Sequence, residues 1–331
     1  MSTRGYFDFL NNQPAYKDSD KKWSVGLLDS TFFWFDLLIN PPQGWDFQKA
    51  AASYLDSYRE EVRNSNDKRF VYFIASRQRV RFSTRKPPKK SLTKSQLILY
   101  VEIGSARKLK KLRFDIPKEA KNAPLPAIIE NGRFISFSSG TSELPTGISV
   151  HEFLMLNGVT LGINTEVLYV GSTDDPAKRP INRDHRGYSD SVYSLSPDET
   201  DIFVFYNLFK VVSVASNSSF MLNFIIANSL IDEVQRVEEG LLLEHCLIHY
   251  FGAKSQEYNK PQEYGRLKNG LKKLLDQYRI QSITFDIEME QPDEFFRFFS
   301  RKICAQDRHY FSLKIVDDAV NITEPEDLTF R

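Results

Sequence analysis

A single carboxylate interrupts an apolar stripe on the helix that the sequence predicts over residues 231–251. The stripe repeats at steps of three and four residues and comprises Val234, Val237, Leu241, Glu244, Ile248 and Phe251. A carboxylate on a buried helix face is costly unless it is paired or bound to a metal ion. Glu244 is therefore expected either to hold a divalent metal or to pair with a core arginine such as Arg179. Glu238 and Glu239, just off the stripe, are expected to be solvated.

Basic residues are concentrated between residues 77 and 121, where 15 Lys or Arg accompany only three acidic residues. This segment carries a net charge of +12 and the remainder −11, within a total of only +1. Arg77, Arg79 and Arg81 alternate, so on a strand they share one face and would repel without an anion. A nucleic-acid backbone is such an anion, and a solvated edge strand is the alternative. The residues predicted to contact nucleic acid here are Arg77, Arg79, Arg81, Arg85, Lys86, Lys89, Lys90, Arg107, Lys108, Lys110 and Lys111.

Residues 150–260, about a third of the chain, resemble the GIY-YIG nuclease family. Tyr169-Val170-Gly171 ends a predicted strand and matches the second half of the motif that names the family. Arg179 follows ten residues after Tyr169, at the spacing of the family's arginine. Glu244 on a later helix, with Asn259 fifteen residues beyond it, completes the order of the family's site residues.

The resemblance implies a phosphodiester hydrolase that acts on DNA with Mg²⁺ or Mn²⁺, ions that favour oxygen ligands. It makes Glu244 the metal ligand and Arg179 a bidentate clamp on the scissile phosphate. Tyr169 would activate the attacking water, and His185 would assist proton transfer or contact the phosphate. The remaining implied residues are Gly171 and Asn259 as site support and Arg183 as a further nucleic-acid contact.

The chain departs from the family pattern at the first strand, because Gly158 and not tyrosine stands eleven residues before Tyr169. The first strand is therefore expected further upstream, with Phe153 or Tyr100 as candidates for its tyrosine position. Arg183 occupies the place where the family's histidine is expected, two residues before His185. These departures keep open a second hypothesis, a catalytically inactive domain that only binds nucleic acid.

A second cluster on the same helix has the form His-Cys-x-x-His, with His245 and His249 on one face. Zinc is conceivable there, but no further ligand stands at a recognisable spacing. We therefore interpret His245, Cys246 and His249 as helix residues that flank the carboxylate.

Patterning along the chain predicts the elements that position these residues. Residues 1–66 are expected to be mostly helical, with one helix beginning at Asp46. Strands follow from a period of two at 71–76, 79–83, 97–103, 112–116, 133–137 and 166–171. Ser149 is expected to cap a helix, and residues 202–215 and 220–227 to form a hairpin. The C-terminal elements expected are a helix at 264–278, a strand at 282–288, a helix at 292–304 and a strand at 310–316.

Composition agrees with a folded chain that is 41% hydrophobic and 26% charged. Two cysteines make no disulfide framework, which favours a reducing, cytoplasmic compartment. No apolar run reaches the ~20 residues of a membrane span, so a membrane partner is not expected. The first residues also lack the apolar core of a signal peptide.

These observations predict an α/β (mixed α+β) protein of three parts. Residues 1–145 form an α+β domain with the basic stretch, residues 146–262 a small GIY-YIG-like sheet with flanking helices, and residues 263–331 an αβαβ segment for packing or assembly. The predicted function is a metal-dependent DNA endonuclease of restriction or phage defence, with RNA as a further possible substrate. The alternative is an inactive nucleic-acid-binding or assembly subunit. A homo-oligomer or a partner protein would contact the N- or C-terminal region.

Overall fold

The computed structural model describes residues 3–39, 47–65, 69–91, 95–137, 146–178, 195–196, 198–217, 219, 221–253, 256, 260–288 and 293–325. Helices and antiparallel and parallel strands are mixed along the chain, which confirms the predicted α+β class. Within this part of the chain, no helix is both long and apolar enough to span a membrane.

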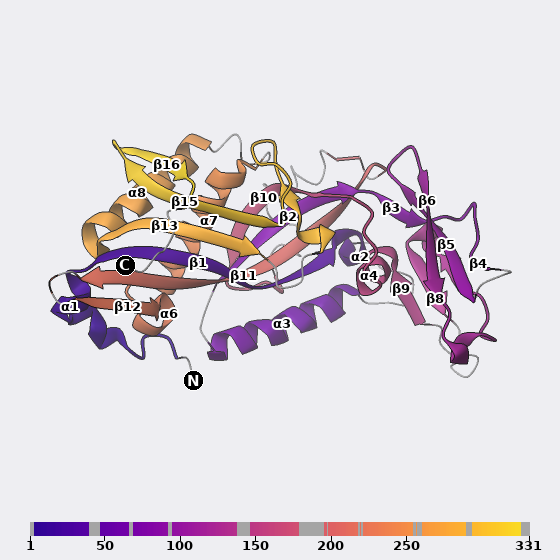
Figure 1. The fold of residues 1–331 in the computed structure, drawn as a ribbon, viewed down its shortest axis with the longest axis horizontal. Coiled ribbons are helices and arrows are strands. Elements are labelled where there is room, and N and C mark those ends of the chain that lie inside the picture. The colour runs from indigo at the N-terminus through magenta and orange to yellow at the C-terminus, as the bar shows by residue number, and fades with distance from the viewer. Residues whose placement is uncertain are drawn as a thin grey trace.

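The largest sheet has nine strands in the order β14–β10–β2–β11–β1–β13–β15–β16, with β12 paired to β11 (Figure 1). The strands are β1 (Asp20–Trp34), β2 (Phe70–Gln78), β10 (Thr165–Thr173), β11 (Thr200–Asn217), β12 (Leu222–Ala227), β13 (Ile280–Glu288), β14 (Phe298–Phe299), β15 (Arg308–Val316) and β16 (Ala319–Thr323). β1 pairs with β13 and β10 with β14 in parallel, and the other neighbours are antiparallel. The hairpin of β11 and β12 matches the prediction.

A long strand, β1, lies at the centre of this sheet and was not predicted, although most of the described residues before residue 66 are helical, as expected. Lys21, Trp23 and Val25 are buried while the residues between them are less so, which is the period of two of a strand. The flanking helices are the 3₁₀ helix η1 (Asp8–Asn12), α1 (Pro14–Lys17), α2 (Phe35–Ile39) and α3 (Phe47–Ser65). Of these, α3 agrees with the helix predicted from Asp46.

Helices cover both faces of the large sheet. α7 (Arg236–Phe251) and α8 (Lys260–Tyr278) pack on one face, in a core that contains Phe73 of β2 and Val170 of β10. α2 and α3 pack on the other face, in a second core that contains Tyr72 and Ile74 of β2. α7 begins later than predicted, after the short α6 (Asn228–Ile231), because Asp232 has a positive φ of 46° that ends the helix.

Two smaller sheets lie together at one end of the elongated molecule (Figure 1). The first contains β3 (Val80–Phe82), β4 (Lys89–Lys90), β5 (Gln96–Ile103) and β6 (Lys108–Asp115), and the second β7 (Ala127–Ile129), β8 (Phe134–Phe137) and β9 (Thr146–Ser149). The helix α4 (Val150–Leu156) follows, and the Ser149 hydroxyl accepts a hydrogen bond from the Glu152 backbone N–H at 3.2 Å. The predicted cap is thereby confirmed. All of these elements lie between β2 and β10 in the chain.

The predicted division into three domains does not match the sheet. The nine strands come from all three predicted parts, since β1 and β2 precede residue 146, β10 to β12 precede residue 263, and β13 to β16 follow it. Strand pairing across the predicted boundaries, such as β1 with β13, joins these parts in one layer. Residues 146–262 therefore supply some strands of a larger sheet and do not form a separate small one.

The predicted helix over residues 292–304 is also wrong. Its described residues form the short 3₁₀ helix η5 (Glu294–Phe296) followed by β14. The reason is packing, because Phe295 and Phe298 are buried in the core and β14 pairs with the start of β10. The described C-terminal order is thus α8, β13, η5, β14, β15 and β16.

Candidate functional site

The Tyr-Val-Gly motif lies on β10, which pairs with β2 so that Gly171 is opposite Tyr72. The rings of Tyr72 and Tyr169 are stacked, with centroids 5.9 Å apart. A Cβ at Gly171 would lie 2.6 Å from Cζ of Tyr72 and 2.8 Å from Cε1 of Tyr169. Glycine is therefore required at the third motif position because two tyrosine rings pass directly over its backbone.

Tyr72 is a residue that sequence reasoning missed. The tyrosine candidates Phe153 and Tyr100 are wrong for the strand beside Tyr169. Phe153 lies on α4 and packs against Phe82, and Tyr100 lies on β5 of the separate sheet. The available signal was the predicted strand over residues 71–76, which contains a tyrosine. The two small sheets separate this strand from β10 in the chain, so spacing alone did not connect them.

Glu244 lies in the middle of α7 and is half-buried. Its carboxylate accepts a hydrogen bond from the Ser172 hydroxyl at the end of β10. No residue of the described chain forms an ion pair with it at 4.0 Å or less. Burial raises the pKa of Glu244 above its usual value; the Ser172 hydrogen bond opposes this change, and the Glu263 carboxylate reinforces it. Glu244 is thus a desolvated carboxylate without a paired cation in this part of the molecule.

The buried face of α7 differs from the predicted stripe. Val237 and Leu241 are exposed, whereas Leu243 and Leu247 are buried. Glu239, predicted to be solvated, is also buried and accepts hydrogen bonds from Asn228 and Arg4. The prediction failed because α7 packs against both β10 and α8, so more than one stripe is covered.

The structure does not bring Tyr169 and Glu244 to one face. Tyr169 packs in the core beneath α3, on the side of the sheet to which Tyr72 points. Ser172 points to the opposite side, where its hydroxyl meets Glu244 of α7. Side chains alternate along a strand, so residues 169 and 172 are directed to opposite faces. The role of Tyr169 in activating water beside Glu244 is therefore not supported by the geometry.

Four further predicted site residues, Arg179, Arg183, His185 and Asn259, lie outside the described residues. In the described chain, Arg69 approaches the Glu244 side of β10. Its guanidinium donates to Asp174 at 2.6 Å and to the Ser172 hydroxyl at 3.4 Å, and its stem packs against Gly240 of α7. Arg69 is thus a cation that reaches the same serine as Glu244 without pairing with the carboxylate.

The histidines after Glu244 line a separate cavity between α7 and α8. His245 Nε2 is 3.2 Å from the Glu263 carboxylate, and the His249 ring lies against Tyr264 with centroids 5.6 Å apart. Cys246 is buried in the core, and burial raises the pKa of its thiol. Among the residues that the structure describes, no group of three or more His, Cys, Asp or Glu is arranged to hold a metal.

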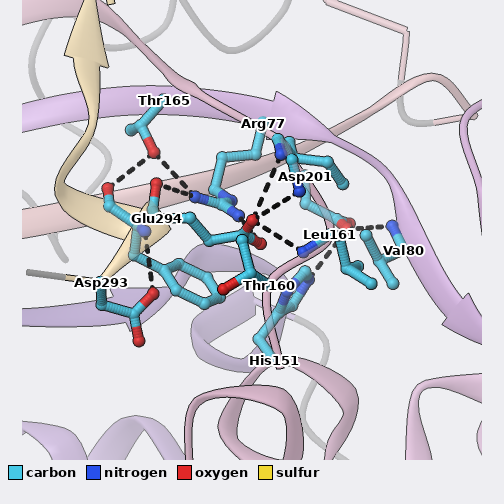
Figure 2. A network of polar contacts seen from close by, with 12 residues as sticks. Arg77, Val80, His151, Thr160, Leu161, Thr165, Asp201, Asp293 and Glu294 are labelled. Atoms are coloured by element: carbon cyan, nitrogen blue, oxygen red, sulfur yellow. Dashed lines mark hydrogen bonds and ion pairs between the residues drawn. The ribbon is translucent and has the colours of Figure 1, made fainter. Parts of the chain in front are cut away.

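Arg77 is not a surface residue, which corrects its assignment to nucleic-acid binding. Only 3% of Arg77 is exposed, and its guanidinium donates to Thr165 Oγ1 at 3.0 Å and Glu294 Oε1 at 2.8 Å (Figure 2). The guanidinium also lies 3.9 Å from the centre of the Phe295 ring. Burial lowers the pKa of Arg77 to about 10, and Glu294 opposes this change, so the side chain stays charged at neutral pH.

Arg79 and Arg81 each have a carboxylate of their own, so the expected repulsion among the three arginines does not arise. Arg79 is 2.9 Å from Asp198, and Arg81 is 2.7 Å from Asp201. Asp201 is buried and also contacts His151 Nε2 and the Val80 backbone N–H, each at 2.9 Å (Figure 2). These pairs join the large sheet to β3, and they supply the anions that the sequence reasoning assigned to a ligand.

The remaining predicted contacts differ in exposure and in partners. Arg85 donates to Glu102 at 3.0 Å, Lys90 to the carbonyls of Lys121 and Ala123, and Lys110 to the Thr160 carbonyl. The side chains of Lys86, Lys89, Arg107, Lys108 and Lys111 are exposed. Of these, Arg107 has only a distant carboxylate, Glu102 at 3.9 Å.

One face of the β4–β5–β6 sheet collects exposed cations around an aromatic ring. Lys89 and Arg113 are both opposite Ile98, and Lys111 is opposite Tyr100, so the strand register places them on the same face. The Lys86 ammonium lies 5.1 Å from the centre of the Tyr100 ring. We call Lys86, Lys89, Tyr100, Lys111 and Arg113 the basic face. Such a surface suits a polyanion whose bases can stack on the ring.

Comparison of the chain with protein-family models, with curated protein sequences and with solved structures gives no match.

Proposed function

We propose that this protein is a metal-dependent endonuclease that binds DNA on the basic face and hydrolyses phosphodiester bonds at Glu244. The observation that carries the proposal is the half-buried carboxylate of Glu244, which has a serine hydroxyl and no cation as its described partner. Its partner Ser172 lies at the end of β10, the strand that carries the Tyr-Val-Gly motif. A desolvated carboxylate with a raised pKa is a functional-site candidate, and the charges of Arg69 and Arg266 oppose only part of this change.

The residues around Glu244 fit a hydrated divalent ion. Mg²⁺ and Mn²⁺ are held by one or two carboxylates and keep several waters, so a closed cluster of protein ligands is not required. The carboxylate of Glu244 and the hydroxyl of Ser172, which contact each other, are the oxygen atoms that would ligate the ion. The negative charge of Glu263 acts on the same carboxylate. When bound, the ion would stabilise charge on the phosphate and make a coordinated water more acidic.

The chain itself supplies further groups for binding the phosphate. Arg69 reaches Ser172 and would present its guanidinium to a phosphate oxygen beside Glu244. By resemblance, Arg179 would clamp the scissile phosphate. Tyr72 and Tyr169 support β2 and β10 from the other face, which holds Ser172 in place without direct contact with the metal.

A role in restriction or phage defence is the biological setting we propose. It rests on analogy, because a nuclease region combined with its own basic binding sheet suits a stand-alone enzyme. The basic face and α7 lie in different halves of the elongated molecule, so bound DNA would extend along its long axis (Figure 1).

The test is cleavage of supercoiled plasmid and of single-stranded RNA with Mg²⁺, with Mn²⁺ or with chelator. Glu244→Gln keeps the shape of the side chain and removes its charge. Glu238→Gln is the matched control, because Glu238 lies on the same helix and pairs with Lys273 at the surface. We expect metal-dependent nicking by the native chain and by Glu238→Gln, and a loss of at least 100-fold, about 3 kcal/mol, in Glu244→Gln.

The second candidate is a catalytically inactive nucleic-acid-binding subunit. The specific observation that favours it is the position of Tyr169 and Glu244 on opposite faces of the sheet. Retained DNA binding by the native chain, with no cleavage of DNA or RNA under any metal condition, would refute the nuclease and support this candidate.

A further inference from the structure

A polar cavity of about 310 Å³ opens between β3, the β5–β6 turn and the 3₁₀ helix η3 (Glu130–Gly132). Three arginines line it, Arg79, Arg81 and Arg107, together with Thr84, Asn131 and the carboxylate of Glu102. Arg107 and Asn131 both have positive φ angles, 49° and 54°, and so does Gly104 in the same turn, 67°. Arg107 and Asn131 thus have a left-handed backbone conformation that is uncommon for residues other than glycine.

Several of these donors have no acceptor in the described chain. Arg79 Nε is buried and has no hydrogen-bond partner. The Thr84 hydroxyl and the Asn131 amide make no side-chain hydrogen bond with any described residue. Arg107 has only the 3.9 Å approach to Glu102. A cavity surrounded by a hydroxyl, an amide and guanidinium groups with spare donors is suited to a ligand that has several acceptor oxygens.

The carboxylates nearby are already occupied. Glu102 accepts from the Ser83 hydroxyl at 2.7 Å and from Arg85 at 3.0 Å. Asp201 is held by Arg81, His151 and the Val80 backbone, and Asp198 pairs with Arg79 from a side chain that is 83% exposed. The cavity therefore favours an anion over a cation or a neutral ligand.

We propose that this cavity binds a phosphate group of the nucleic acid that lies on the basic face. Guanidinium groups match phosphate oxygens in bidentate geometry, and a hydroxyl and an amide complete a donor set around a tetrahedral anion. The cavity and the basic face use neighbouring parts of the chain, because Thr84 and Lys86 lie two residues apart after β3 and Glu102 follows Tyr100 by two on β5. The inference rests on the nucleic-acid binding of the proposed function and is independent of catalysis at Glu244.

The phosphate has two possible sources, a terminal monoester or an internal diester. The test measures binding of 5′-phosphorylated and 5′-hydroxyl oligonucleotides of one sequence by fluorescence anisotropy, with chelator present so that no cleavage occurs. Inorganic phosphate is titrated by calorimetry and as a competitor. The variants are Arg107→Gln and Asn131→Asp, since aspartate tolerates the same positive φ. Lys118→Gln is the matched control, because it removes an equal charge from an exposed residue outside the cavity and outside the predicted nucleic-acid contacts.

We expect inorganic phosphate to bind the native chain and Lys118→Gln, and to bind Arg107→Gln and Asn131→Asp at least about tenfold more weakly. A terminal phosphate is the source if the 5′-phosphorylated strand binds about tenfold better and both cavity variants lose this preference. An internal phosphate is the source if the two strands bind alike and both are weakened more by the cavity variants than by the control.

The proposal is overturned if phosphate does not bind the native chain, or if the cavity variants behave like Lys118→Gln. The two proposals fail separately. Strong oligonucleotide binding that depends on Lys111 but not on Arg107 refutes phosphate binding in the cavity and supports nucleic-acid binding on the basic face. If phosphate binding depends on Arg107 but the chain binds no oligonucleotide, the cavity is a phosphate site, and the proposal that the phosphate belongs to a nucleic acid is refuted.

Discussion

Replacement of Arg77 by methionine should destabilise the fold without changing nucleic-acid binding. Loss of one partner of a buried ion pair typically costs about 3–5 kcal/mol, because the other charge remains buried. Arg77 and Glu294 are both buried, but Glu294 also accepts from the backbone N–H groups of Leu161, Gly162 and Ile163. These donors continue to stabilise the carboxylate, so we expect the lower end of the range, about 3 kcal/mol.

Arg79→Met is the internal comparison. Arg79 pairs with Asp198, whose side chain is 83% exposed, and an exposed pair contributes about 0–1 kcal/mol. Two arginines that look equivalent in sequence should thus differ by about 2 kcal/mol or more. Equilibrium unfolding in urea, followed by both fluorescence and circular dichroism, measures the two free energies and checks for a single transition.

A double-mutant cycle separates the pair from the rest of the site. Glu294→Gln retains one oxygen for the backbone donors at residues 161–163, and the double variant lacks both charges. We expect the double variant to be more stable than the sum of the single changes predicts, with a coupling of about 2 kcal/mol. Independent, additive costs would contradict a direct interaction between Arg77 and Glu294.

DNA binding provides the other half of this prediction. Lys111→Gln should reduce the slope of log K against log salt by about 0.9, the value for one phosphate contact, and Arg77→Met should leave the slope unchanged. The contrary result is that Arg77→Met has the same urea midpoint of unfolding as the native chain and weakens DNA binding as Lys111→Gln does. Arg77 would then be a surface contact, and the reasoning from burial would be wrong.

Two further predictions concern stability. Gly171→Ala should lower the free energy of unfolding by about 1–3 kcal/mol because its Cβ would overlap the Tyr72 ring, whereas Gly26→Ala on β1, with open space at that position, should cost nothing measurable in the same urea titration. Burial lowers the pKa of His309 to about 4, below its ordinary 6.5, so the folded state favours the neutral ring. Stability from this group is complete above pH 6.5 and is lost as the pH falls to about 4, by up to about 3 kcal/mol. Unfolding curves at pH 7, 5.5 and 4.5 should show this slope in the native chain and a shallower one in His309→Gln; equal slopes would exclude His309 as the cause.

Local signals predicted much of the secondary structure correctly. The period of two identified the strands that became β2, β3, β5, β6, β8 and β10, and the Ser149 cap and the helix α3 were found from residue type and spacing. β1 was not predicted, although the buried residues Lys21, Trp23 and Val25 alternate along it with less buried ones. The candidate site was predicted only in part, since Glu244 was identified but its serine partner and the neighbouring Tyr72 were not.

What the amino-acid sequence alone determined about this protein is therefore local: strand and helix periods, one cap, the hairpin of β11 and β12, and a segment of concentrated positive charge. These follow from interactions among residues a few positions apart, which a linear pattern records. The tertiary structure alone decided that Tyr72 lies opposite Gly171, that Glu244 faces Ser172, and that Arg77 is paired with Glu294 and not exposed. Those outcomes depend on which distant segments meet and on which charges lose their water, and both are set only when the chain closes long loops around a shared core.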